Sequence, residues 1–392
     1  MNKVKPSGET FEVTIEKVVY GGDGLGRHDG QTIFVPFSAP GDHLLVRTIE
    51  SRRNFKRAVI EKIILPSPLR RDPPCEHFGV CGGCHLQHLS YQAHLDSKVS
   101  FVRESLRRMG HIDWSQPIPI ISSDEFGYRA RAQFKIDRGA QRIGFYKTGS
   151  HEVRDISYCP LLRSELNEQL TILRNDRSAL SEINEVELAA GENGISFWRN
   201  NSNEDPNVIT QKVGDIEYHF DAQTFFQVNP LILDKLVATA IDDEAGELAV
   251  DLYSGVGLFT VPLSKRFGKV IAVEGNERSV KFAAENLRLN GCSNVDLYAK
   301  SVEDWAIQYS NTVKSVDLVL VDPPRAGIEQ TALESILDMK PSRVSYVSCD
   351  PTTLARDLGR FIAAGYAIQS VTALDMFPQT YHIETVVKLS LK

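Results

Sequence analysis

The sequence predicts an α/β protein with three parts: a small β-barrel over residues 1–65, a central α+β part over 66–222, and a doubly wound α/β domain over 223–392. A chain of 392 residues is too long for one small core. Short strands separated by glycine turns occupy the first part. Segments typical of strands and helices alternate in the last part, which predicts a parallel sheet covered by helices.

The predicted barrel carries a group of basic residues on its last two strands. These residues surround Phe55 and are Arg47, Arg52, Arg53, Lys56 and Arg57. Cations with an interleaved aromatic ring suit contact with single-stranded RNA, although charges also keep an edge strand from pairing. Residues 1–150 hold 22 Lys/Arg and 16 Asp/Glu, a balance of +6, and the rest has a balance of −13, which together give the net charge of −7. This asymmetry is typical of a nucleic-acid-facing part joined to an acidic part, with an uneven solvated surface as the alternative.

Composition and cysteine content indicate the compartment. The N-terminal sequence has no apolar signal region, and no stretch is apolar enough to span a membrane, so we expect a cytoplasmic protein. Six cysteines are too few for a disulfide framework in a chain of this size. We therefore expect thiols or metal ligands. We also expect a monomeric protein.

The central part begins with a proline-rich linker over 66–74 and continues with a helical stretch near 88–110. Residues 126–215 contain alternating runs typical of strands. Two arginines in the first of these runs, Arg129 and Arg131, are predicted RNA contacts.

A glycine-containing loop opens the last part. Asp251 ends an apolar strand, and Gly255 and Gly257 then allow a ligand to approach the backbone closely. Thr260 stands where a dinucleotide-binding loop has a third glycine or alanine, which disfavours NAD. Glu274 ends the next strand, where an acid would bind ribose hydroxyls. The pattern fits S-adenosylmethionine better than NAD, with a purely structural turn as the alternative.

A second turn follows the strand VDLVLV and contains Asp322 and Arg325. Enzymes that methylate exocyclic amines carry an aromatic side chain where this turn has Arg325, so that chemistry is disfavoured. Asp322 is still expected at the carboxyl edge of the sheet, within reach of cofactor and base.

Cys349 ends another predicted strand and directly precedes Asp350 and Pro351, which look like the cap and first residue of a helix. A thiolate adding to carbon 6 of uracil would make carbon 5 nucleophilic enough to accept a methyl group. A general base must then remove the carbon 5 proton. Glu384, at the start of the last strand, is the preferred candidate, and His382 is the alternative. A buried structural cysteine and a surface glutamate are the competing interpretations.

In their order and spacing, several segments resemble the RNA uridine-5-methyltransferases over nearly the whole chain. They are GGDGLGR (21–27), the cysteine cluster described below, FFQVN (225–229), DLYSGVG (251–257), VDPPRAG (321–327), VSCDP (347–351) and PQTYHIE (378–384). The barrel looks like a TRAM domain, which is OB-like. The branch with the greatest similarity is the bacterial 23S rRNA enzymes that carry both TRAM and iron–sulfur modules.

This resemblance implies a Rossmann-like methyltransferase domain that uses S-adenosylmethionine to methylate carbon 5 of a uridine in 23S rRNA, with tRNA as the alternative. It assigns Cys349 as the nucleophile and Glu384 as the general base. Cofactor contacts carry over to Gln227, Tyr253, Glu274 and Asp322. Leu258, where relatives often have Asn, and Ser301 are left unassigned as ligands.

Four cysteines, Cys75, Cys81, Cys84 and Cys159, supply the number of thiolates that an iron–sulfur cluster or a zinc site requires. His77, His85 and His88 lie nearby in the sequence and keep zinc as an alternative. The resemblance implies a [4Fe–4S] cluster with a structural or RNA-positioning role. Cys292 is predicted to be a packed residue near a helix end.

Three other functions stay open from the sequence. An RNA cytidine-5-methyltransferase would have a second cysteine where this chain has Pro323 to Arg325. An iron–sulfur electron-transfer protein or nicotinamide oxidoreductase would leave Cys349 and Glu384 without a role, and optical spectra with nicotinamide would test it. An RNA-binding module without activity would transfer no methyl group from labelled cofactor.

Overall fold

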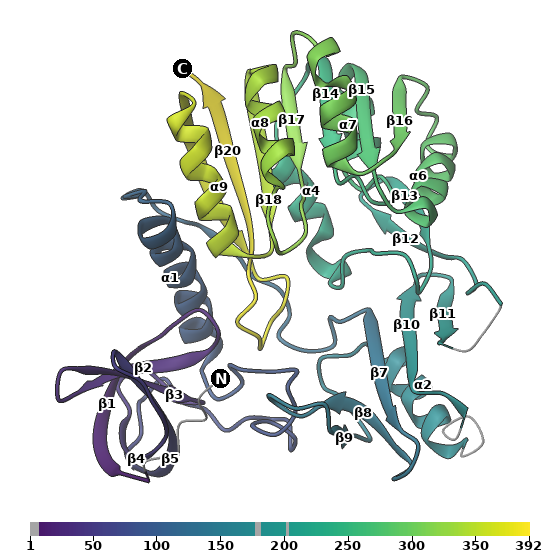
Figure 1. Ribbon diagram of the computed structural model, residues 1–392. Coiled ribbons are helices and arrows are strands. Elements are labelled where there is room, and N and C mark those ends of the chain that lie inside the picture. The colour runs from purple at the N-terminus through teal and green to yellow at the C-terminus, as the bar shows by residue number, and fades with distance from the viewer. Residues whose placement is uncertain (1–7, 177–181, 201–203) are drawn as a thin grey trace.

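The computed structural model describes residues 8–176, 182–200 and 204–392. A closed barrel and a small antiparallel sheet lie side by side, and a large mixed sheet with its helices lies beyond both of them (Figure 1). No helix in the described ranges is both long and apolar enough to cross a bilayer.

The N-terminal barrel is closed in the strand order β1-β2-β3-β5-β4, as the turn spacing predicted. Its strands are β1 (Thr10–Val18), β2 (Asp23–His28), β3 (Gln31–Pro36), β4 (His43–Ser51) and β5 (Phe55–Leu65). Alternate residues of β1, such as Val13 and Ile15, point into a core with Ile33, Val35 and Leu44. Gly21 and Gly22 form the turn between β1 and β2 with φ angles of 106° and 92°, which favour glycine.

The first helix of the central part is α1 (Tyr91–Met109), which lies close to its predicted position. Ser90 caps its first turn. A five-stranded sheet of order β11-β10-β7-β8-β9 follows, with helix α2 (Ser164–Asn175) packed on it. The strands are β7 (Arg131–Asp137), β8 (Arg142–Tyr146), β9 (Val153–Asp155), β10 (Glu185–Gly191) and β11 (Gly194–Arg199). Strands β12 (Ile209–Val213) and β13 (Ile216–Phe220) form a separate hairpin. The residues that follow this hairpin form most of a large eight-stranded sheet.

The large sheet has the order β16-β15-β14-β17-β18-β20-β19-β6. Strands β14 to β18 run parallel, and β20 is antiparallel to both neighbours, so this is a doubly wound sheet with an antiparallel addition. The strands are β14 (Gly246–Leu252), β15 (Phe267–Glu274), β16 (Val295–Ala299), β17 (Leu318–Val321), β18 (Arg343–Ser348), β19 (Tyr366–Leu374) and β20 (Glu384–Leu391).

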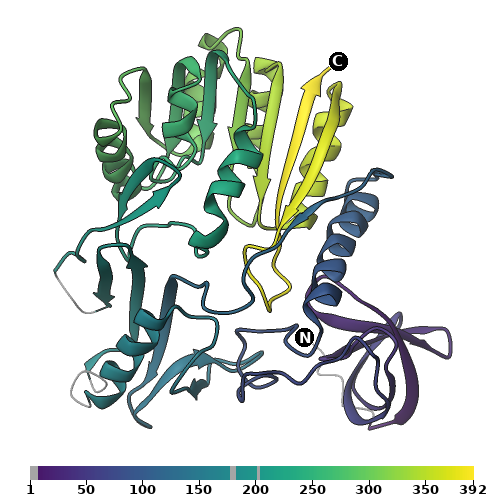
Figure 2. The ribbon, with the colours of Figure 1, turned by 180° about the vertical axis from the view of Figure 1, so that it is seen from behind.

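Helices cover both faces of this sheet. Helices α7, α8 and α9 lie on the face seen in Figure 1, and α4 lies on the opposite face, which Figure 2 shows. The helical segments are η1 (Pro230–Ile232), α4 (Leu233–Ile241), α5 (Thr260–Ser264), α6 (Glu277–Leu289), α7 (Val302–Tyr309), η2 (Ser310–Thr312), α8 (Gln330–Met339) and α9 (Pro351–Ala363). Helix α1 packs against α9, and strand β6 (Ile120–Ile121) joins the edge of the sheet. Residues before 223 therefore contribute to the C-terminal fold.

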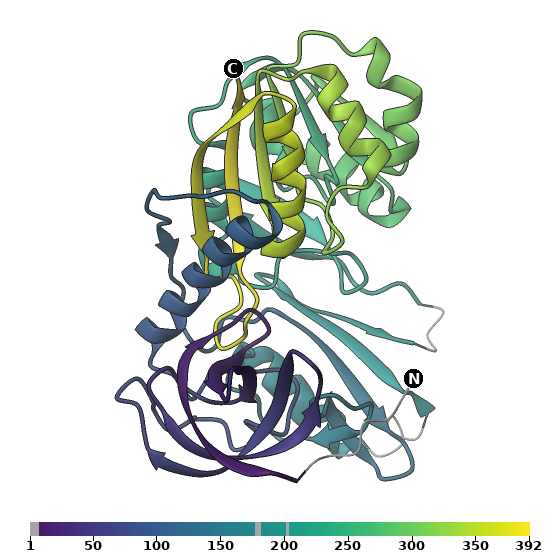
Figure 3. The same cartoon turned by 60° about the vertical axis from the view of Figure 1, so that its left-hand side comes forward.

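The loop between β19 and β20 connects the large sheet to the other parts. It leaves the sheet and meets the barrel and the cysteine segment (Figures 1 and 3). The carbonyl oxygen of Gln379 accepts hydrogen bonds from the backbone N–H groups of His85 (2.9 Å) and Leu86 (3.1 Å). The buried Lys98 of α1 donates to Oδ1 of Asp375 (2.5 Å) and to the carbonyl of Phe377 (3.0 Å). These contacts fix the loop just before Glu384.

Candidate active site

The glycine loop after β14 has the geometry of a ligand-binding turn. Gly255 and Gly257 have φ angles of 56° and 94°, and a Cβ at Gly255 would meet nothing within 4 Å. The carboxylate of Glu274 accepts hydrogen bonds from the backbone N–H groups of Gly255 (2.8 Å) and Asn276 (2.7 Å). Glu274 therefore lies at the carboxyl edge beside the loop, where the sequence predicted it.

Two buried carboxyl groups, Asp251 and Glu384, and the half-buried Asp322 lie at the same edge. Burial raises the pKa values of Asp251 and Asp322 to about 7, and the charge of Asp322 adds to the rise at Asp251. Burial and the charge of Asp322 also raise the pKa of Glu384 well above its ordinary value. Oδ1 of Asp251 and Oε1 of Glu384 are buried without a hydrogen-bond partner. Such a cluster favours a positively charged ligand, which would neutralise it.

Cys349 directly follows the last residue of β18, and Glu384 is the first residue of the neighbouring strand β20. Strand β18 pairs with β20 so that Ser348 faces Thr385, and the next residues in this antiparallel register are Cys349 and Glu384. Burial raises the pKa of the half-buried Cys349 thiol to about 12, and the charges of Glu384 and Asp322 contribute to the rise. The thiol therefore holds its proton in the absence of ligands.

The residues after Cys349 form the predicted helix start. Oδ1 of Asp350 accepts hydrogen bonds from the backbone N–H groups of Thr352 (2.8 Å) and Thr353 (3.3 Å), and Pro351 is the first residue of α9. The cap is thus confirmed. The favourable helix terminus does not lower the thiol pKa here, because burial and the surrounding carboxylates outweigh it.

The two candidates for the base differ in basicity. Burial, together with the charge of the nearby Arg325, lowers the pKa of His382 to about 3. The pKa of Glu384 is raised instead, so its carboxylate is the stronger base of the two. The geometry therefore favours Glu384.

The structure shows where the other residues considered as cofactor contacts lie. Gln227 is buried in the segment that precedes η1. Tyr253 begins the glycine loop with φ at 63°, and its hydroxyl donates to Glu329 at the start of α8. Leu258 is buried in the core, and Ser301 caps α7 by accepting from the N–H of Asp304 (3.0 Å).

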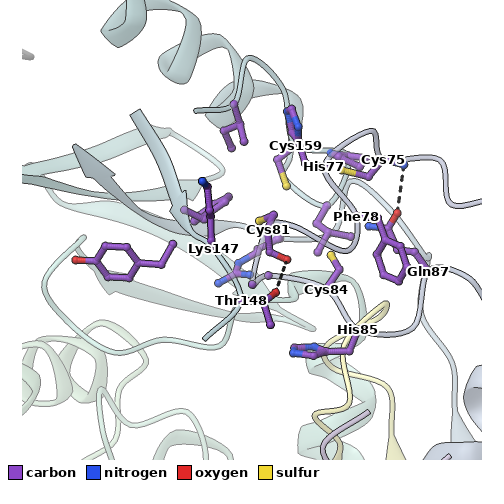
Figure 4. A pocket seen from close by; sticks show the side chains of 18 of the residues that line it. Cys75, His77, Phe78, Cys81, Cys84, His85, Gln87, Lys147, Thr148 and Cys159 are labelled. Carbon is purple, nitrogen blue, oxygen red and sulfur yellow. Dashed lines mark hydrogen bonds between the residues drawn. The ribbon is translucent and has the colours of Figure 1, made fainter. Parts of the chain in front are cut away.

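The four predicted metal-ligand cysteines line one cavity of about 380 Å³ (Figure 4). Burial raises the pKa values of Cys84 and Cys159, the latter to about 11, and the charge of Cys159 contributes at Cys84. Among the described residues, no three His, Cys, Asp or Glu side chains stand together as ligands of one metal ion. The structure thus groups the thiols around a space without showing the [4Fe–4S] centre.

Two of the histidines near this cavity have other partners. A ring nitrogen of His77 lies 3.3 Å from the guanidinium of Arg154, and that of His88 lies 3.1 Å from the carbonyl of Ser38. Arg129 lines the cavity, and the charges of Arg129 and Arg154 both act to lower the pKa of Cys81, which burial raises. The cavity therefore pairs thiols with cations.

Several basic residues have roles that the sequence did not reveal. Arg131, a predicted RNA contact, is half-buried and donates to the carbonyls of Asp221 (3.2 Å) and Ala222 (2.7 Å), so its guanidinium supports a loop. Arg129 lines the cysteine cavity. Four of the barrel cations are paired with carboxylates: Arg47 with Glu61, Arg52 with Glu50, Lys56 with Glu9 and Arg57 with Asp23.

Comparison with known proteins gives the family. Residues 142–392 match the tRNA (Uracil-5-)-methyltransferase family, and residues 5–60 match the TRAM domain. The chain belongs to the tRNA (Uracil-5-)-methyltransferase family. It is thus an RNA uracil-5 methyltransferase, as the motifs predicted, and its barrel is a TRAM domain.

Members of this family resemble the chain along its whole length. An uncharacterized RNA methyltransferase of Aquifex aeolicus is 31% identical and aligns over 97% of this chain and 99% of its own. The 23S rRNA (uracil(1939)-C(5))-methyltransferase of Pectobacterium atrosepticum is 33% identical over 96% and 93% of the two chains. The crystal structure of the Pyrococcus abyssi tRNA (uracil-54, C5)-methyltransferase in complex with S-adenosyl-L-homocysteine superposes with a TM-score of 0.75, at 28% identity over 97% of this chain and all of that one.

Proposed function

We propose that the protein transfers a methyl group from S-adenosylmethionine to carbon 5 of one uridine in 23S rRNA, through a covalent bond between Cys349 and carbon 6. The observation that carries this proposal is the cross-strand placement of Cys349 beside Glu384, with Asp322 close to both. A nucleophile and a base on the same edge of the sheet are what the addition and elimination steps require.

The reaction balances with these two residues. The Cys349 thiolate adds to carbon 6, and the electrons of the 5,6 double bond move onto carbon 5 and the adjacent carbonyl. Carbon 5 then attacks the methyl carbon of the donor; the methyl–sulfur bond breaks, its electron pair stays on sulfur, and the resulting thioether leaves. Glu384 removes the proton from carbon 5, the double bond re-forms, and the Cys349 thiolate leaves carbon 6. The uridine must be unstacked first, because its carbon 6 face is covered in a helix.

The residues at the carboxyl edge fit a sulfonium cofactor. Gln227, Tyr253, Glu274 and Asp322 would hold it, and when bound S-adenosylmethionine supplies an electrophilic methyl group on a positively charged sulfur. The fit rests on the open glycine loop and on the unpaired, buried oxygens of Asp251 and Glu384. A nearby positive charge lowers the pKa values of Cys349 and Glu384 and so promotes the ionised forms that the chemistry needs.

We propose that the cysteine cavity holds an iron–sulfur cluster. Cys75, Cys81, Cys84 and Cys159 would hold [4Fe–4S], whose role here is to order the surrounding loops. The four thiols are among the residues that line a cavity of about 380 Å³, and the charges of Arg129 and Arg154 favour the thiolate of Cys81. Methyl transfer changes no oxidation state, so the proposed mechanism assigns the cluster no redox step. Iron content and an absorbance band that Cys84→Ser removes would test the assignment.

The RNA target is proposed from the relatives. The Pectobacterium protein, named as a 23S rRNA enzyme, and the Pyrococcus protein, named as a tRNA enzyme, both align with nearly the whole chain. The higher identity of the former favours 23S rRNA. Mapping of 5-methyluridine in RNA from a strain that lacks the protein tests the choice. Loss from 23S rRNA supports it, and loss from tRNA alone overturns it.

Trapping with 5-fluorouridine tests the covalent step. Fluorine at carbon 5 cannot leave as a proton, so RNA containing the analogue should remain bound to the protein in the presence of cofactor. Cys349→Ala should abolish the adduct, and Cys292→Ala, which changes another half-buried free cysteine, should retain it. An adduct that persists in Cys349→Ala would rule out the assignment.

A further inference from the structure

Tyr20 extends from the TRAM barrel into the methyltransferase site. It lies in the connection between β1 and β2, and its hydroxyl donates a hydrogen bond of 3.1 Å to Oδ2 of Asp350, 330 residues later in the chain. Its ring makes edge contacts with Phe101 of α1 and with Tyr381 of the loop between β19 and β20, at centroid distances of 6.0 and 5.3 Å. Contacts from three segments therefore fix the position of the hydroxyl.

The acceptor of this hydrogen bond is the residue next to Cys349. Oδ1 of Asp350 is engaged by the start of α9, so Oδ2 is the oxygen left to face the barrel. The charge of Asp350 acts on the Cys349 thiol and raises its pKa. Hydrogen-bond donation to a carboxylate stabilises its negative charge and weakens its effect on neighbouring groups.

Other groups face the same sulfur. Glu384 of β20 and Asp322 of the turn after β17 raise the pKa of Cys349, and Arg325 of that turn lowers it. The raised pKa of Tyr20 is caused first by burial, then by Asp350, and also by Tyr381 and Cys349, so the phenol and the thiol lie within electrostatic range. Tyr20 is thus the barrel's contribution to a site built otherwise from the large sheet.

We propose that Tyr20 is a positioning residue of the active site: its hydroxyl holds the Asp350 carboxylate in the capping position and reduces the negative field at the Cys349 sulfur. The proposal rests on Cys349 as the nucleophile. It gives the barrel a second role besides RNA contact, because the barrel's position then affects how readily the thiolate forms.

Alkylation of Cys349 by iodoacetamide tests the proposal, read for that residue by peptide mass spectrometry. Tyr20→Phe removes only the hydroxyl, and alkylation at pH 8 should slow by about 3- to 10-fold, which corresponds to a rise of roughly half to one pKa unit. Asp350→Asn keeps a good helix cap but removes the charge, so it should speed alkylation. In the Asp350→Asn protein, Tyr20→Phe should have no further effect.

A matched control separates this role from general packing. Tyr366→Phe removes a phenol that donates to the carbonyl of Pro341 (2.9 Å) at the far end of β19, and it should leave alkylation unchanged. Equal rates for wild type and Tyr20→Phe would overturn the proposal, as would an equal slowing in the Asp350→Asn background. If Tyr20→Phe does not fold, the Asp350→Asn variant alone tests the proposal. Alkylation of Cys349 that is no faster in Asp350→Asn than in wild type would then overturn it. Alkylation measures the reactivity of the Cys349 thiol whether or not that thiol is the nucleophile of methyl transfer. Failure of fluorouridine trapping would therefore contradict the proposed function separately from the alkylation result.

Discussion

Asp251 is expected to make the protein less stable as pH rises. Its side chain is fully buried, and Oδ2 accepts a hydrogen bond of 2.5 Å from the Thr260 hydroxyl. Burial raises its pKa from 3.8 to about 7, which the Thr260 hydrogen bond partly opposes and the charges of Asp322 and Glu274 reinforce. Asp251→Asn keeps a carbonyl oxygen for Thr260 and removes the titration.

The size and sign of the effect follow from that pKa. Between about pH 4 and pH 7 the unfolded carboxyl is ionised while the folded one keeps its proton, so the free energy of unfolding falls as pH rises. A difference of about three pKa units corresponds to about 4 kcal/mol by pH 8, of which about 1.5 kcal/mol is already lost at pH 5. The stability of Asp251→Asn relative to wild type should therefore grow by about 2.5 kcal/mol from pH 5 to pH 8.

Urea unfolding of the ligand-free protein at both pH values measures this difference. Tryptophan fluorescence is a suitable signal, because Trp305 is 1% exposed in the core of the same sheet. Asp113→Asn, a change at an exposed aspartate, is the control and should track wild type at both pH values. Comparison across pH cancels any constant effect of the amide on packing. A difference between Asp251→Asn and wild type that is the same at pH 5 and pH 8 would refute the reasoning.

Three other variants test the site and the contacts around it. Glu384→Gln should lower turnover by about 10²- to 10⁴-fold and accumulate a covalent adduct with unmodified uridine RNA on denaturing gels; a fully active variant would contradict its role as base. Lys98→Met should cost about 3–5 kcal/mol in urea unfolding, because Asp375 stays buried without its ion pair, and adding Asp375→Asn should restore part of the loss. Gly22→Ala should lower the melting temperature more than Gly30→Ala. Both glycines have positive φ, but only a Cβ at Gly22 would meet another side chain, that of His85 at 2.9 Å. Equal losses in melting temperature would contradict this.

Local patterns predicted the elements that carry the chemistry. Cys349 and Asp322 each follow an apolar strand and Glu274 ends one, and parallel strands place such residues at one edge of a sheet. The helix cap at Asp350 was likewise readable from the sequence, because capping depends on residues close in the chain. The proximity of Cys349 to Glu384 could not be predicted from local patterns, because it depends on the antiparallel insertion of β20 between β18 and β19.

Charge alone did not predict what the arginines do. Arg129 and Arg131 stand two residues apart in one alternating run, and both were expected to contact RNA. One faces the cysteine cavity and the other donates to the carbonyls of residues 221 and 222. Both outcomes depend on segments distant in sequence, so neither leaves a local signal. The buried pair of Lys98 and Asp375, 277 residues apart, was missed for the same reason.

The pKa values at the site account for its composition. The charge of Asp322 disfavours the ionised forms of Asp251 and Glu384, and Glu384 and Asp322 also disfavour the Cys349 thiolate. Such an arrangement costs stability in the empty protein and leaves the nucleophile protonated. A bound sulfonium would supply the missing positive charge, so the ionised nucleophile and base are favoured when the methyl donor is present. In the proposed mechanism, the same carboxylates that weaken the ligand-free fold therefore link activation of Cys349 to binding of the cofactor.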